Sequence, residues 1–463
     1  MKAVVPILST AERGFARTFA RLRAVGAADA GRAEAVARAI VDAVRRRGDR
    51  ALLEYTKRFD GVALTPSTLQ VPAEALRAAA AALPPHVRAA LRLAARRIRA
   101  FHARQRQRSW RYRDASGLVL GQQITPLRRV GVYVPGGHAA YPSSVLMNVI
   151  PARVAGVDEV IMVSPAGPAG HAPAVLAAAH IAGASAVYRI GGAQAVAALA
   201  YGTRTIARVD KIVGPGNAFV QAAKRQVYGQ VDIDSTAGPS EVLVIADAHA
   251  DPALVAADLL AQAEHDADAT ALCLTPSALL AAAIERALDA QLATLSRAAI
   301  ARRALRSRGA IVVTRSLREA LDLANEIAPE HLELAVRSPR RYLRDLRHAG
   351  AIFLGSSTPE AFGDYLAGPN HVLPTGGTAR FSSPLGVYDF LKRTSVIEAS
   401  PRALARLARP LLRLAAMEGL SAHAAAVSRR LERRKPPLSA ARRGSETGRR
   451  AASGRRSHST RAS

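Results

Sequence analysis

The sequence predicts an α/β protein with two doubly wound domains in succession. From residue 118 onwards, apolar runs alternate with glycine turns and helical patterns, beginning with "RRVGVYV" before "PGG" and "DEVIMVSP" before "AGPAG". A second series of the same kind starts at "SEVLVIAD". Apolar strands that alternate with helices form parallel sheets with helices on both faces. We therefore expect two parallel sheets, each covered by helices on both sides.

Helical segments flank these two series. In the N-terminal third, "AEAVARAIVDAVRRR" and "PPHVRAALRLAARRIRAF" repeat apolar residues at spacings of three and four, as amphipathic helices do. The closing stretch "PRALARLARPLLRLAAM" has the same helical pattern. The residues after 432 are mostly Arg, Ser, Ala and Gly with almost nothing to bury, so we expect a disordered tail there.

Composition excludes several classes of protein. The formal net charge of +29 suggests a nucleic-acid partner, but the excess is mostly Arg spread along helices and concentrated in the tail, so we expect no specific nucleic-acid site. No apolar run reaches the roughly 18 residues that a membrane helix needs, and the N-terminus does not form a convincing signal peptide. We expect neither a membrane partner nor export.

The single cysteine, Cys273, excludes an intrachain disulfide framework and fits a reducing, cytoplasmic location. It lies in "ATALCLTP", which has the pattern of a buried strand. An inert core cysteine is therefore expected in preference to a nucleophile. That placement also counts against any mechanism that needs a thiohemiacetal.

A first candidate for chemistry is "NEIAPEHLEL", where Glu330 and His331 follow Pro329. Proline is favoured in the first turn of a helix, and an acid there suits the helix dipole, so a purely structural role is one interpretation. The other is that both side chains face one pocket from a helix N-terminus. The local pattern leaves both open.

Further candidates are potential metal ligands. In "AQAEHDADA" a helical geometry places Gln262 and His265 on one face and turns Glu264 away, although a solvated face is an equal alternative. The long polar stretch from 358 to 377 carries Glu360, Asp364 and His371, and loops of that length are usually functional. "MEGLSAH" adds Glu418 and His423. Zinc sites commonly combine two ligands that are close together in the sequence with others from distant segments.

Three glycine turns follow strands of the first series: Pro135-Gly136-Gly137, Gly191-Gly192 and Gly214-Pro215-Gly216-Asn217. Ligands of open α/β sheets bind where such turns meet helix N-termini. None of the three is the G-x-G-x-x-G fingerprint, so the motifs alone favour a dinucleotide only weakly. Tight turns would use the same glycines.

Eight segments run in order along the chain: "LRRVGVYVPGGHAAYPSSVLMNVIPARVAGV", "RIGGAQAVAALAYGT", "DKIVGPGNAFV", "AGPSEVLVIAD", "LLAQAEHD", "NEIAPEHLEL", "GPNHVLPTGGTARFSSPLGVYDFLKRTSVI" and "EGLSAH". Together they closely resemble the histidinol dehydrogenase family, over about residues 33 to 431. The tail after residue 432 has no counterpart in that pattern, and Ser235-Thr236 stand where an apolar residue is more usual.

The resemblance implies an oxidoreductase that completes histidine biosynthesis. L-histidinol would be oxidised through L-histidinaldehyde to L-histidine with two NAD⁺ and one Zn²⁺ per subunit, on two Rossmann-like domains. Glu330 and His331 would be the catalytic bases. The other implied positions are zinc ligands at Gln262, His265, Asp364 and His423, and NAD contacts at Tyr133, Gln194 and Asn217. The implied substrate-binding positions are Ser240, Gln262, His265, His331, Glu360, Asp364, His371, Glu418 and His423.

The resemblance also implies a homodimer with shared active sites, in which the C-terminal helical segment reaches the partner subunit. The expected division is an N-terminal helical arm (1–32), a first α/β domain with the zinc and catalytic residues (33–131 and 240–385), a second, NAD-binding α/β domain (132–239), a C-terminal helical segment (386–431) and the tail (432–463). A zinc-dependent hydrolase without nicotinamide remains the alternative, since it could use the same ligands with Glu330 as base.

Overall fold

The computed structural model describes residues 3–23, 30–136 and 140–432. By their contacts the residues form two compact units: Met1–Gln107 with Ile124–Lys392, and Arg108–Gln123 with Arg393–Ser463. The larger unit contains two parallel sheets with helices on both faces, which confirms the predicted α/β class. The part of the tail beyond residue 432 lies outside the described residues, so its expected disorder stays a prediction.

The first sheet of the larger unit has five parallel strands. In spatial order they are β6 (Ala186–Tyr188), β5 (Glu159–Val163), β4 (Arg129–Tyr133), β7 (Lys211–Val213) and β8 (Asp232–Ile233). The chain runs outwards from β4 in one direction and then returns to continue in the other. The strand order therefore reverses at β4, and in doubly wound sheets ligands bind at such a switch point.

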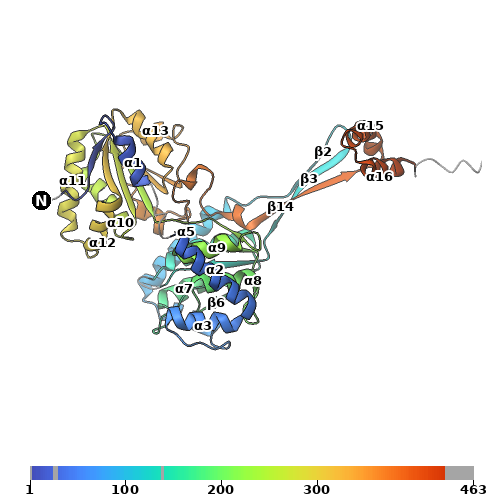
Figure 1. Cartoon of the computed structure of the whole chain (residues 1–463), viewed down its shortest axis with the longest axis horizontal. Helices are drawn as coiled ribbons and strands as arrows, with labels where there is room; N and C mark the ends of the chain where they lie inside the picture. Colours follow the sequence, from blue (N-terminus) through green and yellow to red (C-terminus); the bar gives the residue numbers. More distant parts are fainter. Residues whose placement is uncertain (1–2, 24–29, 137–139, 433–463) are drawn as a thin grey trace, which may run out of the picture. The chain divides into compact units, whose positions relative to one another are not determined.

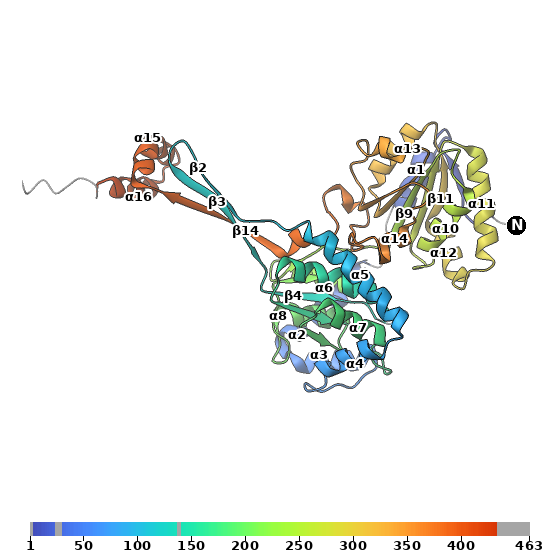
Figure 2. The same cartoon turned by 180° about the vertical axis from the view of Figure 1, so that it is seen from behind.

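Helices cover both faces of this sheet (Figure 2). On one face α2 (Ala30–Arg47), α3 (Asp49–Asp60), α8 (Gly192–Tyr201) and α9 (Ala218–Val227) share one apolar core. On the other face lie α5 (Pro85–Ala103), α6 (Pro142–Ala155) and α7 (Pro173–Ala182), with α4 (Ala73–Ala82) packed on α7. Strand residues alternate between the two cores, as β geometry requires: Val130 and Val132 face one, Tyr133 the other.

The packing of these helices differs from the domain boundaries expected from the sequence. Residues 33–131 were grouped with the catalytic domain, but α2 to α5 pack on the five-stranded sheet. Residues of the stretch 385–390 also lie in that sheet's core. Amphipathic helices present the same apolar stripe to any sheet, so their sequence pattern does not specify which sheet they cover.

The second sheet has six parallel strands. In spatial order they are β1 (Ile7–Ser9), β11 (Gly309–Val313), β10 (Thr270–Thr275), β9 (Glu241–Ala246), β12 (His331–Ala335) and β13 (Ala351–Leu354). The N-terminal arm, expected to be helical, therefore contributes an edge strand before α1 (Phe15–Arg23). Cys273 is fully buried in β10, as expected.

Helices cover both faces of the six-stranded sheet too (Figure 1). Val242 and Val244 share a core with α10 (Pro252–Ala263), α11 (Ala278–Leu292) and α12 (Ala298–Arg308). Leu243 and Ile245 pack with α13 (Leu317–Ile327) on the opposite face. The remaining helical elements of the larger unit are α14 (Glu360–Tyr365) and the 3₁₀ turns η1 (Pro339–Tyr342), η2 (Thr378–Arg380) and η3 (Val387–Phe390).

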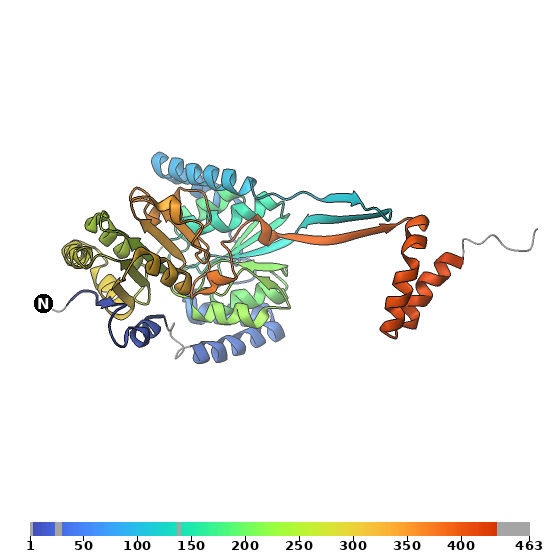
Figure 3. The ribbon, with the colours of Figure 1, turned by 90° about the horizontal axis from the view of Figure 1, so that it is seen from above.

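The smaller unit is built on a three-stranded sheet of β14 (Leu391–Ala399), β3 (Leu118–Pro126) and β2 (Trp110–Arg113). Two helices follow β14, namely α15 (Pro401–Met417) and α16 (Ser421–Glu432), as Figure 3 shows. The segment 386–431, expected to be helical throughout, thus opens with a 3₁₀ turn and a strand. Among the described residues no helix is long and apolar enough to cross a membrane.

Candidate active site

Glu330 and His331 do not open a helix. Helix α13 ends at Ile327, Ala328 follows in the left-handed conformation with φ 53°, and β12 starts at His331. The expected helix start at Pro329 is therefore wrong. The pair lies at the amino end of β12, an interior strand between β9 and β13, and is almost fully buried, with 6% of Glu330 and 4% of His331 exposed. Buried ionisable groups at a strand end are more typical of a functional site than of a helix cap.

The backbone of one residue, Glu241, orients both side chains. The backbone N–H of Glu241, at the start of β9, donates to Glu330 Oε2 at 2.9 Å. The carbonyl oxygen of the same residue lies 3.0 Å from His331 Nδ1. A carbonyl only accepts, so Nδ1 carries the proton and the lone pair of the imidazole is left on Nε2. The neighbouring strand thus fixes the tautomer in which His331 can act as a base.

The surroundings set the protonation of each group. Burial lowers the pKa of His331 to about 4, although the nearby Asp364 raises it, so the imidazole is neutral at pH 7. Burial raises the pKa of Glu330 well above its usual value, and the charges of Glu241 and Asp364 add to that effect. A hydrogen bond from the Ser240 side chain opposes it. Ser240, a predicted substrate contact, therefore lies against Glu330.

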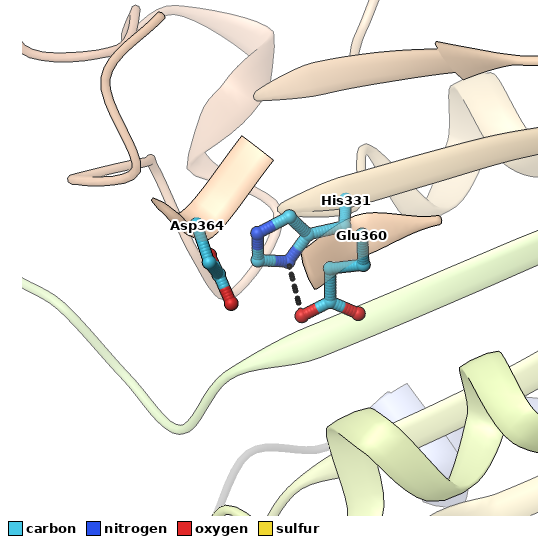
Figure 4. A group of neighbouring side chains, drawn as sticks. All are labelled: His331, Glu360 and Asp364. Carbon is cyan, nitrogen blue, oxygen red and sulfur yellow. Dashed lines mark ion pairs between the residues drawn. The ribbon is translucent and has the colours of Figure 1, made fainter. Parts of the chain in front are cut away.

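His331, Glu360 and Asp364 form a group that could hold a metal ion, since one ligand atom of each lies within 4.8 Å of the others (Figure 4). His331 Nδ1 is 3.6 Å from Glu360 Oε1. Oxygen and imidazole ligands suit Zn²⁺. Of the four expected zinc ligands, Asp364 belongs to this group.

Gln262 and His265 lie at the end of α10. Helices of a parallel α/β domain run opposite to its strands, so this helix end and the starts of β9 and β12 lie on one edge of the sheet. The side chain of Gln262 is fully buried, yet neither its amide oxygen nor its nitrogen has a partner among the described residues. Buried polar atoms are nearly always paired, so a bound ligand would supply the partner that this amide lacks. His265 is exposed and acts electrostatically on His331.

His371 approaches the same group from the long polar stretch. Its Nδ1 lies 3.0 Å from the carbonyl oxygen of Asp364, and its Nε2 lies 3.5 Å from Ser144 Oγ on α6. Burial lowers the pKa of His371, although the charge of Asp364 acts to raise it. Glu360, which opens α14, is held in place by its backbone, since its N–H donates to Glu333 Oε1 at 2.8 Å.

Glu333 was not predicted as a site residue. It lies two residues after His331 on β12, where side chains share a face, and it is hydrogen-bonded to Asp258 of α10. Burial, followed by the Asp258 charge, raises the pKa of Glu333 to about 9. The two carboxyl groups thus share a proton at neutral pH. The signal in the sequence was a second acid in the apolar strand "HLEL".

Tyr133, Gln194 and Asn217 line one pocket of about 500 Å³ in the five-stranded domain. The pocket lies at the carboxyl end of β4, where the strand order reverses. Tyr133 Oη accepts the backbone N–H of Gly192 at 3.1 Å. Asn217 caps α9 by accepting from the N–H groups of Phe219 and Val220, both at 3.1 Å. Gln194 is buried with its amide unpartnered among the described residues.

The glycine turn before Asn217 is constrained by close packing. A Cβ on Gly214 would lie 2.1 Å from the carbonyl oxygen of Tyr133, so no other residue fits. The buried Lys224 donates to the carbonyl oxygen of Gly214 at 3.0 Å and to Asp234. This turn therefore has a defined geometry at the mouth of a pocket.

Glu418 and His423 belong to the smaller unit. Glu418 caps the end of α15 and His423 lies in the first turn of α16, and both are exposed. Within the larger unit, the structure brings together Ser240, Glu330, His331, Glu360, Asp364 and His371.

Comparison with known proteins gives the family. The family model described as histidinol dehydrogenase matches residues 24–431. Histidinol dehydrogenase of Syntrophotalea carbinolica is 58% identical over 85% of this chain and 91% of its own length, and that of Bordetella parapertussis is 53% identical over 93% and 98%. The crystal structure of histidinol dehydrogenase from Elizabethkingia anophelis superposes with a TM-score of 0.88 at 34% identity, covering 94% of this chain and 99% of the other. The chain belongs to the histidinol dehydrogenase family of oxidoreductases.

Proposed function

We propose that this protein oxidises L-histidinol to L-histidine in two successive NAD-dependent steps, with one Zn²⁺ in each active site. The observation that carries the proposal is the pair of neighbouring side chains, Glu330 and His331, held in fixed orientations by the backbone N–H and carbonyl groups of Glu241. The first oxidation requires a base that accepts the hydroxyl proton of the alcohol, and the second requires a base that accepts a proton from the water added to the aldehyde. An imidazole beside a carboxylate can supply both bases.

His331 would take the hydroxyl proton of the alcohol at Nε2, because its Nδ1 is committed to the Glu241 carbonyl. Glu330 would activate the water that adds to the aldehyde, since a carboxylate can accept a proton from that water. Substrate would be held by Ser240, Glu360 and His371, which surround the pair. NAD⁺ supplies the hydride acceptor for each oxidation, and Zn²⁺ supplies an electrophilic template for the substrate's polar groups.

Gln262, His265 and Asp364 are the residues of this unit that would hold zinc. The unpartnered amide of Gln262 and the oxygen of Asp364 beside His331 support the fit. Tyr133, Gln194 and Asn217 would bind the dinucleotide, since their pocket lies where doubly wound sheets bind such ligands. A reducing, cytoplasmic setting fits a chain with one buried cysteine.

Glu418 and His423 would serve the active site of a partner subunit in a homodimer. In support, the unit that carries them exposes large apolar side chains, with Ile397 73% and Met417 82% exposed. Mixing a His423→Asn variant with a His331→Asn variant should restore part of the lost activity, because each hybrid dimer retains one intact site. A mixture no more active than its components would exclude shared sites.

The decisive experiment is an assay of NADH formation with L-histidinol before and after chelation. We expect two NADH for each L-histidine formed, loss of activity on chelation, and recovery when zinc is returned. A hydrolase that uses the same metal would form no NADH. Absence of NADH from zinc-loaded protein would therefore refute the proposed function.

A further inference from the structure

The pocket lined by Tyr133, Gln194 and Asn217 also has an apolar side. Val36, Ile40, Phe59 and Phe219 also line it. Half of Phe59 and 39% of Phe219 are exposed. Tyr55 stacks on the Phe59 ring, with the ring centroids 5.7 Å apart, so the exposed Phe219 ring is the main aromatic surface that the pocket offers. Exposed aromatic faces stack on flat heterocycles such as a nucleobase.

Asp60 connects this aromatic side with the glycine turn at the start of α8. It follows Phe59 in the chain, lines the pocket, and accepts a hydrogen bond from the backbone N–H of Gly191. The next N–H, that of Gly192, donates to Tyr133 Oη. A carboxylate therefore links Phe59 of α3 with the glycine turn that begins α8, and both border one pocket.

The position of Asp60 is unfavourable for a carboxylate. It is the last residue of α3, where the helix dipole disfavours negative charge. Burial raises its pKa to about 6. Its Oδ2 is buried without a partner among the described residues. A buried acceptor without a donor is rare in folded proteins, and a ligand that supplies the donor would explain it.

An adenosine ribose supplies such a donor between a base and a diphosphate. In doubly wound folds that bind NAD, a carboxylate accepts from the ribose 2′-hydroxyl, whereas arginine accommodates a 2′-phosphate. Asp60 comes from a different element, the end of α3, but offers the same acceptor to the pocket. Among the described residues that line the pocket, none is Lys or Arg. The guanidinium of Arg58 stacks on Phe59, with its carbon 5.4 Å from the ring centroid, and does not line the pocket.

We propose that Asp60 binds the adenosine ribose hydroxyl of NAD and excludes dinucleotides that carry a 2′-phosphate. The proposal rests on the proposed NAD dependence and names the residue that makes the cofactor choice. A charged acceptor hydrogen-bonded to the 2′-hydroxyl favours NAD, and its repulsion of a phosphate at the same place disfavours NADP.

The test is titration of NADH and NADPH into Asp60→Asn and the unmodified protein. Asparagine keeps an acceptor for the Gly191 N–H but removes the charge. We expect the unmodified protein to bind NADH at least about 100-fold more tightly than NADPH, and the variant to lose about 10- to 100-fold of that preference, the scale of one charge-assisted hydrogen bond. Asp49→Asn is the matched control, since Asp49 lies on the same helix, accepts from Thr205 and does not line the pocket.

An unchanged NADH-to-NADPH ratio in a folded Asp60→Asn variant would overturn the proposal. Should that variant not fold, the unmodified protein still decides the matter, because equal affinity for NADH and NADPH, or undiminished affinity for a 2′-deoxyribose analogue of NADH, contradicts it. Failure of the proposed function gives a separate result. The unmodified protein would then form no NADH from L-histidinol, whatever the binding measurements show for Asp60.

Discussion

The Nδ1 atom of His331 lies 3.0 Å from the carbonyl oxygen of Glu241, ninety positions earlier in the chain. The N–H of the same Glu241 donates to Glu330. Glu330 immediately precedes β12 and His331 is its first residue, so neighbouring segments must hold both side chains for them to face one pocket. The N–H and carbonyl groups of Glu241, at the start of β9, provide these constraints, and the two side chains can then be tested for separate roles.

Loss of each base should affect a different half of the reaction. His331→Asn should slow the oxidation of L-histidinol, because nothing else at that position accepts the hydroxyl proton. Glu330→Gln should slow conversion of supplied L-histidinaldehyde far more than the first hydride transfer. Losses of about 10²- to 10⁴-fold are typical for removal of one general base. The measurement is the oxidation rate of each variant with the alcohol and with the aldehyde, which gives four rates to compare. If Glu330→Gln oxidises the aldehyde as fast as the unmodified protein, the proposed separation of roles is wrong.

His265→Asn should remove bound zinc and activity while leaving the fold intact, because the residue lies at an exposed helix end and contributes to no core. Elemental analysis after gel filtration measures the metal. His249→Asn serves as the control, since His249 is also exposed and lies in a turn after β9. Full zinc occupancy in the His265 variant would remove this residue from the ligand set.

Glu333→Leu should lower both kcat and the melting temperature. The change leaves the N–H of Glu360 without its acceptor and Asp258 without its partner, each a loss of about 1–3 kcal/mol for a buried group. Glu333→Gln should behave almost like the unmodified protein, because an amide replaces a carboxyl that is protonated at neutral pH. Steady-state kinetics compare the two, and equal kcat values for Leu and Gln would argue against a positioning role.

Cys273 should resist alkylation in the folded protein. It is completely buried, and burial raises the pKa of its thiol to about 12, so almost no thiolate forms at neutral pH. Mass spectrometry after iodoacetamide treatment should show labelling only in denaturant. Cys273→Ala should keep turnover within a few-fold. Rapid labelling with loss of activity would instead indicate a catalytic thiol.

Truncation after residue 432 should leave turnover and melting temperature nearly unchanged. The removed segment contains few residues that could be buried, and its positive charge is suited to non-specific contact with polyanions. Parallel assays of the full and truncated chains measure both quantities. A large drop in melting temperature would show that the tail docks on the body of the protein.

The sequence by itself determined the βαβ repeats and the positions of the glycine turns. Buried parallel strands need continuous apolar runs, and the runs around Val132 and Val244, each followed by a turn and a helical pattern, meet that need. Likewise the spacing of Gln262 and His265 selected the amide in preference to Glu264, and that amide proved to be buried and unpartnered.

Only the tertiary structure decided the environment of the catalytic pair. A proline followed by an acid is common at helix starts, and nothing nearby in the sequence contradicted that interpretation. The backbone instead leaves α13 at Ala328 and enters a strand, because pairing of β12 with β9 and β13 satisfies its buried peptide groups. The groups that fix the proton on His331, raise the pKa of Glu330 and hold Glu360 come from distant segments. Local patterns do not encode such contacts, since they exist only once the sheet has formed.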